Sequence, residues 1–215
     1  MRGGRYLVRA KVARPVSDGT ATLAWDVART LRGALDELAT SLAGAPATFP
    51  IFETLATFAQ RARKPLARMS DEAQATLEAL QPYHAIGGFR NGELWMLQQL
   101  AGAEPPRLAA GAVRAGGTMG VNTQRKVSIV GEPAIATGAF DDGDVIASVA
   151  TAIVGPDPKL DMYLRVEMAL ALARQGPGRG RELVALLGAL CDHVEQVVFG
   201  SVPGPASRSS SDGHV

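Results

Sequence analysis

Apolar residues recur at helical spacing in two long stretches of the chain, and this spacing predicts two amphipathic helices. The first stretch covers residues 20–43, follows the turn-forming residues 17–19 and ends at Gly44 and Pro46. At about 100° per residue its apolar side chains share one face; they are Val27, Leu31, Leu35, Leu38 and Leu42. The second stretch covers residues 180–199, and its apolar stripe consists of Leu183, Leu187, Leu190, Val194 and Val198.

Shorter helices are expected between these two. The sequence FPIF (residues 49–52) predicts an extended link, because a residue that precedes proline is disfavoured in the helical conformation. A helix follows the link and is broken at Pro65. Ser70 is a typical N-cap with acidic residues behind it, so it predicts a helix over residues 71–80. A last helix in this region is expected over residues 91–100.

The sequence LWMLQQLAGAEPPR (residues 94–107) begins as a helix and ends in two prolines. Gln98 and Gln99 are expected to face solvent or to cap neighbouring backbone groups, and the proline pair cannot continue a helix. The expected buried face has positions i, i+3 and i+6, which are Leu94, Leu97 and Leu100. We therefore interpret this segment as a structural crossover from a helical to a β-rich part of the chain.

Alternating apolar and polar positions predict strands in two regions. Residues 5–12 alternate at the start of the chain. Residues 107–173 form short apolar-rich segments separated by turns, and DDGD (residues 141–144) indicates a hairpin. Residues 160–172 are good helix formers, yet every second residue is Leu, Met or Val, so we predict a strand there.

Together these elements predict an α+β fold, in which a helical bundle carries an inserted antiparallel sheet of roughly three to five strands. The apolar stripes of the first and last helices are expected to pack against each other, and the sheet to rest on helices. We expect a single domain over residues 1–200, helical over 18–104, β-rich over 107–173 and helical again over 180–199. Residues 201–215 are rich in Ser, Pro and Gly and are expected to be disordered.

Composition argues against several classes of function. Among 215 residues, 22 Lys and Arg nearly balance 21 Asp and Glu, so the net charge of +1 gives no strong nucleic-acid signal. The single Cys191 allows neither an intramolecular disulfide nor a multi-cysteine zinc site, and we expect no cofactor and no metal. No stretch approaches about 18 consecutive apolar residues, and no signal peptide is evident. A soluble, cytoplasmic protein without a membrane partner is expected.

Four segments in series carry a resemblance to a known family. They are TLRGALDELA (residues 30–39), FPIF, LQPYH (residues 80–84) and LWMLQQLAGAEPPR. Together they resemble a family of uncharacterised bacterial proteins, in which the segments read approximately Asn-Leu-Arg-Ser-Ala-Leu-Asp-His, Phe-Pro-Ile, Leu-Gln-Pro-Tyr and Leu-Trp-x-Leu-His-Glu-Leu-x-Asn-x-Asp-Lys-His-Arg. The resemblance spans about residues 5–200. It implies a shared architecture rather than an activity, because the family has no assigned biochemistry.

The histidines of the family pattern are replaced in this chain. Arg32 and Asp36 match the pattern, but Glu37 stands where a histidine is usual, and Gln98 and Gln99 stand where His-Glu is usual. Histidine exchanges a proton near neutral pH and glutamine does not, so the resemblance implies a disabled site if the family performs proton chemistry. An Arg and a His separated by four to six residues mark HEPN ribonucleases, and Glu37 breaks that pattern.

The candidate polar site consists of Arg29, Arg32, Asp36, Glu37, Glu104 and Arg107. The arginines could bind a phosphate or a carboxylate, although a salt bridge on a helix surface is the more ordinary interpretation. We expect a non-catalytic binding or structural module, with a protein partner or a second copy of the chain. The alternative is an HEPN-like or other hydrolase of RNA or phosphate esters with a degenerate site.

Other polar motifs favour structural interpretations. QGPGRGRE (residues 175–182) precedes a helix, as phosphate-binding loops do, but it lacks their sequence pattern and is expected to be a connector. RARKPLAR (residues 61–68) is basic without aromatic residues, which is typical of a solvated helix end. His84 and His193 lack metal-ligand spacing, and Cys191 is expected in the core.

Overall fold

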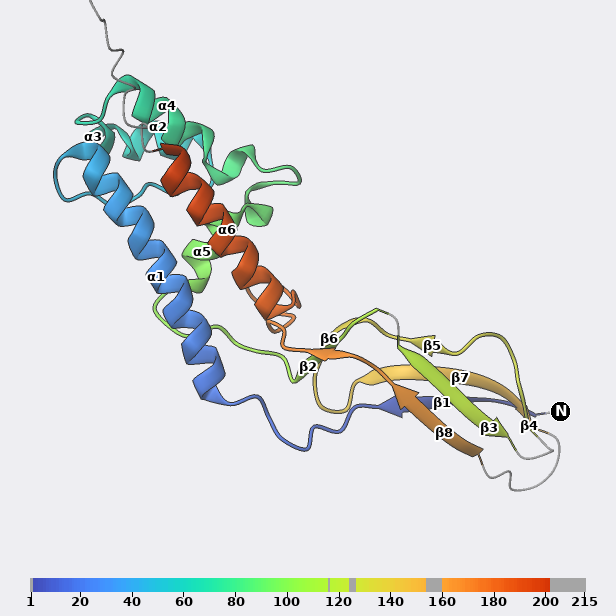
Figure 1. The fold of residues 1–215 in the computed structure, drawn as a ribbon. Coiled ribbons are helices and arrows are strands. Elements are labelled where there is room, and N and C mark those ends of the chain that lie inside the picture. Colours follow the sequence, from blue (N-terminus) through green and yellow to red (C-terminus); the bar gives the residue numbers. More distant parts are fainter. Residues whose placement is uncertain (1, 116, 124–126, 154–159, 202–215) are drawn as a thin grey trace, which may run out of the picture. The chain divides into compact units, whose positions relative to one another are not determined.

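The computed structural model of the chain describes residues 2–115, 117–123, 127–153 and 160–201 (Figure 1). Helices and antiparallel strands are combined in it, which confirms the predicted α+β class. Residues 202–215, where disorder was expected, lie outside the described residues.

The chain divides into two compact units. The strand unit consists of Met1–Ala28 and Gln99–Gly188, and the helical unit consists of Arg29–Gln98 and Ala189–Val215. The long helices α1 (Asp18–Ala43) and α6 (Leu183–Ser201) contribute residues to both units. The single domain expected over residues 1–200 stays a prediction.

The helical unit holds most of the shorter helices, and local sequence signals account for where they begin. Ser70 is an N-cap as predicted, since its Oγ accepts a hydrogen bond from the Ala73 amide at 3.2 Å. Thr54 caps in the same way and was not predicted. The helix after the link ends at Arg61, and Pro65 lies inside a further short helix rather than marking the break. The bounds are α2 Leu55–Arg61, α3 Arg63–Leu66, α4 Asp71–Ala79, η1 Pro82–His84, η2 Phe89–Asn91 and α5 Glu93–Leu100.

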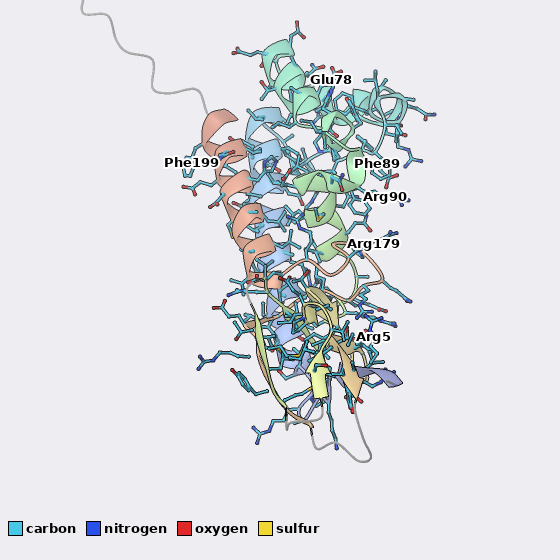
Figure 2. The ribbon with its side chains drawn as sticks, turned by 90° about the vertical axis from the view of Figure 1, so that its right-hand side faces the viewer. Arg5, Glu78, Phe89, Arg90, Arg179 and Phe199 are labelled. Carbon is cyan, nitrogen blue, oxygen red and sulfur yellow. The ribbon has the colours of Figure 1, made fainter. Side chains whose placement is uncertain are left out.

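The two long helices bury apolar stripes, but the stripe of α6 differs from the predicted one. In α1, Leu35 and Leu38 are buried, as expected. In α6 the buried row consists of Leu183, Leu186, Leu190, Val194 and Val197, whereas Leu187 and Val198 are half-buried. Both rows of α6 are apolar, so packing rather than sequence selects between them. The parts of α1 and α6 in the helical unit lie side by side in both views (Figures 1 and 2), while the full helical bundle stays a prediction.

Helix α6 also has an exposed apolar side. Val184 and Phe199 are exposed, and Phe199 points away from the neighbouring helices in Figure 2. By length and composition alone, Leu183–Gly200 could cross a bilayer, and 28% of this segment is buried. Core helices of soluble proteins meet the same criterion. The expected absence of a membrane partner therefore stays a prediction.

Among the residues that the structure describes, the strands form three antiparallel sheets, whereas a single sheet was expected from the sequence. Strand β7 (Val145–Ile153) is the centre of the largest, where it pairs with β1 (Arg2–Arg9), β4 (Val127–Ile129) and β5 (Ala134–Ile135). A second sheet has the order β6 (Gly138–Phe140), β2 (Gly111–Val113), β9 (Met168–Ala169). The third pairs β3 (Thr118–Thr123) with β8 (Leu160–Arg165). Long-range pairing of this kind carries no local signal that sequence patterns could report.

The segment 160–172 is extended, as predicted, but is not one strand. Strands β8 and β9 are separated at Val166 and Glu167, where the Glu167 carbonyl accepts a hydrogen bond from the Arg114 amide at 2.9 Å. Half-buried and exposed side chains alternate over residues 162–167, and this alternation is lost beyond the break, where Met168 is exposed like Glu167.

The DDGD turn does not form the hairpin that its sequence indicates. It joins β6 to β7, and these strands belong to different sheets. Its carboxylates instead hold other parts of the chain: Asp142 Oδ1 accepts from the Val12 amide at 2.7 Å, and Asp144 pairs with Arg174. Side-chain hydrogen bonds of this kind compete with a hairpin turn.

We expect Asp144→Asn to remove part of the acid sensitivity of folding. The hydrogen bond from the Asp141 amide, and secondarily the charge of Arg174, lowers the pKa of the Asp144 carboxyl below its usual value. A lowered folded-state pKa stabilises the fold above the usual pKa of about 4, and this stabilisation is lost as the pH falls through the folded-state value. Urea melts at pH 6 and pH 3 should therefore show a smaller loss of stability for Asp144→Asn than for the wild type. Glu132→Gln, which removes an exposed carboxylate, is the control; equal losses in all three proteins would contradict the prediction.

Candidate functional site

Arg32 and Asp36, the central pair of the predicted site, both bind the backbone of Phe49 in the extended link. Arg32 Nη2 donates to the Phe49 carbonyl at 2.6 Å, and Asp36 Oδ1 accepts from the Phe49 amide at 2.8 Å. The two side chains are one helical turn apart on α1 and also form an ion pair at 3.0 Å. Both backbone groups of Phe49 are thereby satisfied without a β-ladder, which holds the link against α1.

Gln81 holds the other end of the link. Its side-chain oxygen accepts from the Phe52 amide at 2.9 Å, and its nitrogen donates to the carbonyls of Pro50 at 2.9 Å and Leu77 at 2.8 Å. Gln81 is only 2% exposed, so these bonds satisfy a buried amide. Gln81 was not predicted as a site residue, and its place in the LQPYH motif is the one sequence feature that points to it.

The motifs that carry the family resemblance therefore meet at the link. The first supplies Arg32 and Asp36, the third supplies Gln81, and the fourth supplies Trp95, whose Nε1 donates to Glu53 Oε1 at 3.0 Å. Their common feature is the support of residues 49–53, which is a structural role.

A pocket of about 840 Å³ lies beside the link within the helical unit. Its charged lining residues are Arg32, Lys64 and Arg68, and none of the described residues that line it is acidic. Thr48, Phe52 and Gln98 also line this pocket, which we term the basic pocket. Lys64 and Arg68 belong to the RARKPLAR segment, for which the sequence predicted a solvated helix end. In the structure both line this pocket together with Arg32.

One guanidinium nitrogen of Arg32 has no hydrogen-bond partner among the described residues. Its Nη1 atom is buried and has no hydrogen-bond partner among the described residues, whereas Nη2 binds Phe49 and Asp36. A buried donor without a partner is destabilising, so an acceptor that reached Nη1 would be bound favourably.

None of the remaining residues of the predicted site is among the lining residues of the basic pocket. Arg29 and Glu37 are exposed on α1, and neither is among the lining residues of the basic pocket. Glu104 is exposed in the strand unit, and Arg107 lines a different pocket within that unit. The structure thus pairs Arg32 with Asp36 and places Arg107 at a separate pocket.

The hydroxyl of Tyr83 is buried, and Tyr83 is not among the lining residues of the basic pocket. Burial, and secondarily the Glu78 carboxylate, raises the pKa of the Tyr83 hydroxyl above its usual value. The ring packs edge-on against Phe58 with a centroid distance of 6.3 Å. The hydroxyl is therefore protonated near neutral pH and is no candidate for a general base.

Among the described residues, the two histidines and the cysteine do not form a catalytic or metal-binding cluster. His84 is exposed and contacts the ring of Tyr83, with centroids 4.4 Å apart. Cys191 is exposed rather than in the core as expected, because it lies outside the buried row of α6. Among the described residues, no group of three or more His, Cys, Asp or Glu could hold a metal ion.

The glycine-rich segment before α6 has the properties of a connector. Gly178 has φ +77°, and a Cβ there would clash with the buried side chain of Leu172, so both backbone conformation and packing favour glycine. The Gly180 amide binds the Ala173 carbonyl at 3.2 Å, and the Arg181 amide binds the Gly178 carbonyl at 2.8 Å. These amides are consequently not available to a phosphate.

Comparison of the chain with known protein families, with curated proteins and with solved structures finds no match. The resemblance to the bacterial family stays a prediction.

Proposed function

We propose that this protein is a non-catalytic binding module that holds a phosphate or carboxylate group in the basic pocket. The observation that carries this proposal is the lining of that pocket by Arg32, Lys64 and Arg68 without an acidic residue among the described ones. Lys64 and Arg68 are exposed and could approach an anion without a large cost of desolvation.

The contacts of Arg32 and Asp36 support a binding function over hydrolysis. Asp36 binds the Phe49 amide and Arg32, so its carboxylate is an acceptor within the link rather than a free base. The alternative, an HEPN-like or other hydrolase of RNA or phosphate esters, requires a group that exchanges protons beside the anion. No histidine, aspartate or glutamate is present among the described residues that line the basic pocket.

The recognised group is defined by its chemistry. Arginine presents planar paired donors that match phosphate and carboxylate oxygens, and lysine adds a point charge. A small phosphorylated molecule carries the phosphate group, and an acidic segment of a protein partner or of a second copy of the chain carries carboxylate groups. Because two of the cations are exposed, binding should weaken as the salt concentration rises.

The test is the double variant Lys64→Ala/Arg68→Ala, titrated with pyrophosphate by calorimetry at low salt. We expect about tenfold weaker binding than in the wild type, which corresponds to about 1.4 kcal/mol. The matched control is Arg61→Ala/Arg90→Ala, which removes two exposed cations of the same unit that are not among the lining residues (Arg90 is labelled in Figure 2).

Equal weakening in both double variants would attribute binding to net charge and contradict the proposal. Release of orthophosphate from pyrophosphate, or cleavage of RNA, that is lost in Asp36→Asn would favour the hydrolase instead. Thermal melts of each variant establish that the fold is retained.

A further inference from the structure

A second pocket, of about 710 Å³, lies entirely within the strand unit. Its volume falls in the range of small-molecule sites, roughly 300–1,000 Å³. Two proline-containing links, the start of α1 and the DDGD turn surround it. Most of its lining residues are apolar, and those from the two links include Val12, Pro15, Val16, Pro105 and Pro106. This lining suits an apolar body of a ligand.

Charges of both signs line the same pocket without neutralising each other. Arg107 supplies a guanidinium, and Asp18 and Asp142 supply carboxylates. Within the described part of the chain, no ion pair joins Arg107 to either aspartate. Opposite charges that share a pocket but do not pair are complementary to a molecule that itself carries both charges.

The backbone around each charged residue is fixed. Asp142 Oδ1 accepts from the Val12 amide at 2.7 Å, which orients this carboxylate. The Arg107 carbonyl accepts from the Ala173 amide at 2.9 Å. Asp18 lies in the first turn of α1, where the helix dipole favours a negative side chain. Because the Asp142 carboxylate is held in place before binding, less entropy is lost at this group when the ligand arrives.

We propose that this pocket binds a small zwitterion with an apolar body, an amino acid or a short peptide with free ends. Arg107 binds its carboxylate, and Asp18 and Asp142 bind its ammonium group. The apolar lining contacts the body of the ligand, while the three charged side chains are exposed and can reach its charged ends. This site is independent of the basic pocket, because the two are lined by different residues of different units.

The test compares ligands that differ by one charged group. L-leucine carries both charges, 3-methylbutan-1-amine lacks the carboxylate, and 4-methylpentanoate lacks the ammonium group. We expect L-leucine or L-leucyl-L-leucine to bind at least about tenfold more tightly than either single-charge analogue, about 1.4 kcal/mol per lost contact. Tighter binding of leucine than of the dipeptide would indicate a free amino acid as the ligand, and the reverse order would indicate a short peptide.

Two variants assign the contacts. Arg107→Gln should reduce the affinity for leucine to that for the amine and leave the amine unaffected. The double variant Asp18→Asn/Asp142→Asn should reduce the affinity for leucine to the affinity for 4-methylpentanoate. The amide oxygen introduced at position 142 can still accept a hydrogen bond from the Val12 amide. The control is Glu132→Gln, which removes an exposed carboxylate that does not line the pocket.

Equal binding of all four ligands, or an affinity unchanged in both charge variants, would show apolar adsorption and overturn the proposal. Absence of binding by every ligand to the folded wild type would overturn it as well. Neither result bears on pyrophosphate binding in the helical unit.

Discussion

Leu97→Ala is expected to lower the free energy of unfolding by about 2–5 kcal/mol, the usual cost of removing a fully buried leucine side chain. Leu97 is 0% exposed, and Leu94 and Leu100 on the same face of α5 are also buried. The substitution removes apolar burial and leaves a cavity that neighbouring side chains fill only in part. Urea denaturation monitored by circular dichroism measures the loss.

The glutamines of the same helix are the matched controls. Gln98 and Gln99 are exposed, so Gln98→Ala and Gln99→Ala should each change stability by no more than about 0.5 kcal/mol. A cost for Leu97→Ala as small as that of the glutamine variants would contradict the assignment of α5 to the core. Because Gln98 lines the basic pocket, loss of anion binding in Gln98→Ala at unchanged stability would identify α5 as part of the site.

Gln81→Ala is expected to cost about 2–4 kcal/mol, because it leaves buried backbone groups without partners. The side chain binds the Phe52 amide and the carbonyls of Pro50 and Leu77, and the truncated residue can replace none of these bonds. The same urea experiment measures the effect. We also expect faster proteolysis within residues 49–53, since the link loses its attachment to the segment between α4 and η1.

Gln74→Ala is the control for the loss of a glutamine side chain in the same region, since Gln74 lies on α4. Gln74 is half-buried and donates one hydrogen bond, to the Met69 carbonyl at 3.0 Å, so about 1 kcal/mol or less is expected. If Gln81→Ala cost no more than Gln74→Ala, the hydrogen bonds of Gln81 would not be what stabilises this end of the link.

The candidate site was predictable only in part. Arg32 and Asp36 are separated by four residues on a helix, so sequence spacing alone predicts their ion pair, which the structure contains at 3.0 Å. Their binding to Phe49 was not predictable, because a side chain that satisfies an isolated backbone amide leaves no periodic pattern. The approach of Lys64 and Arg68 to Arg32 depends on how the chain folds back after the link.

The sequence by itself determined the elements whose physical cause is local. The α1 helix, the Ser70 cap and the buried face of α5 follow from periodicity and from hydrogen bonds that span three or four residues. Only the tertiary structure decided which apolar row of α6 is buried, how the strands divide among three sheets, and what the DDGD carboxylates bind. In each of these cases the sequence permits several arrangements of similar local energy. Packing and long-range hydrogen bonds select one of them, and both act between residues that no local pattern relates.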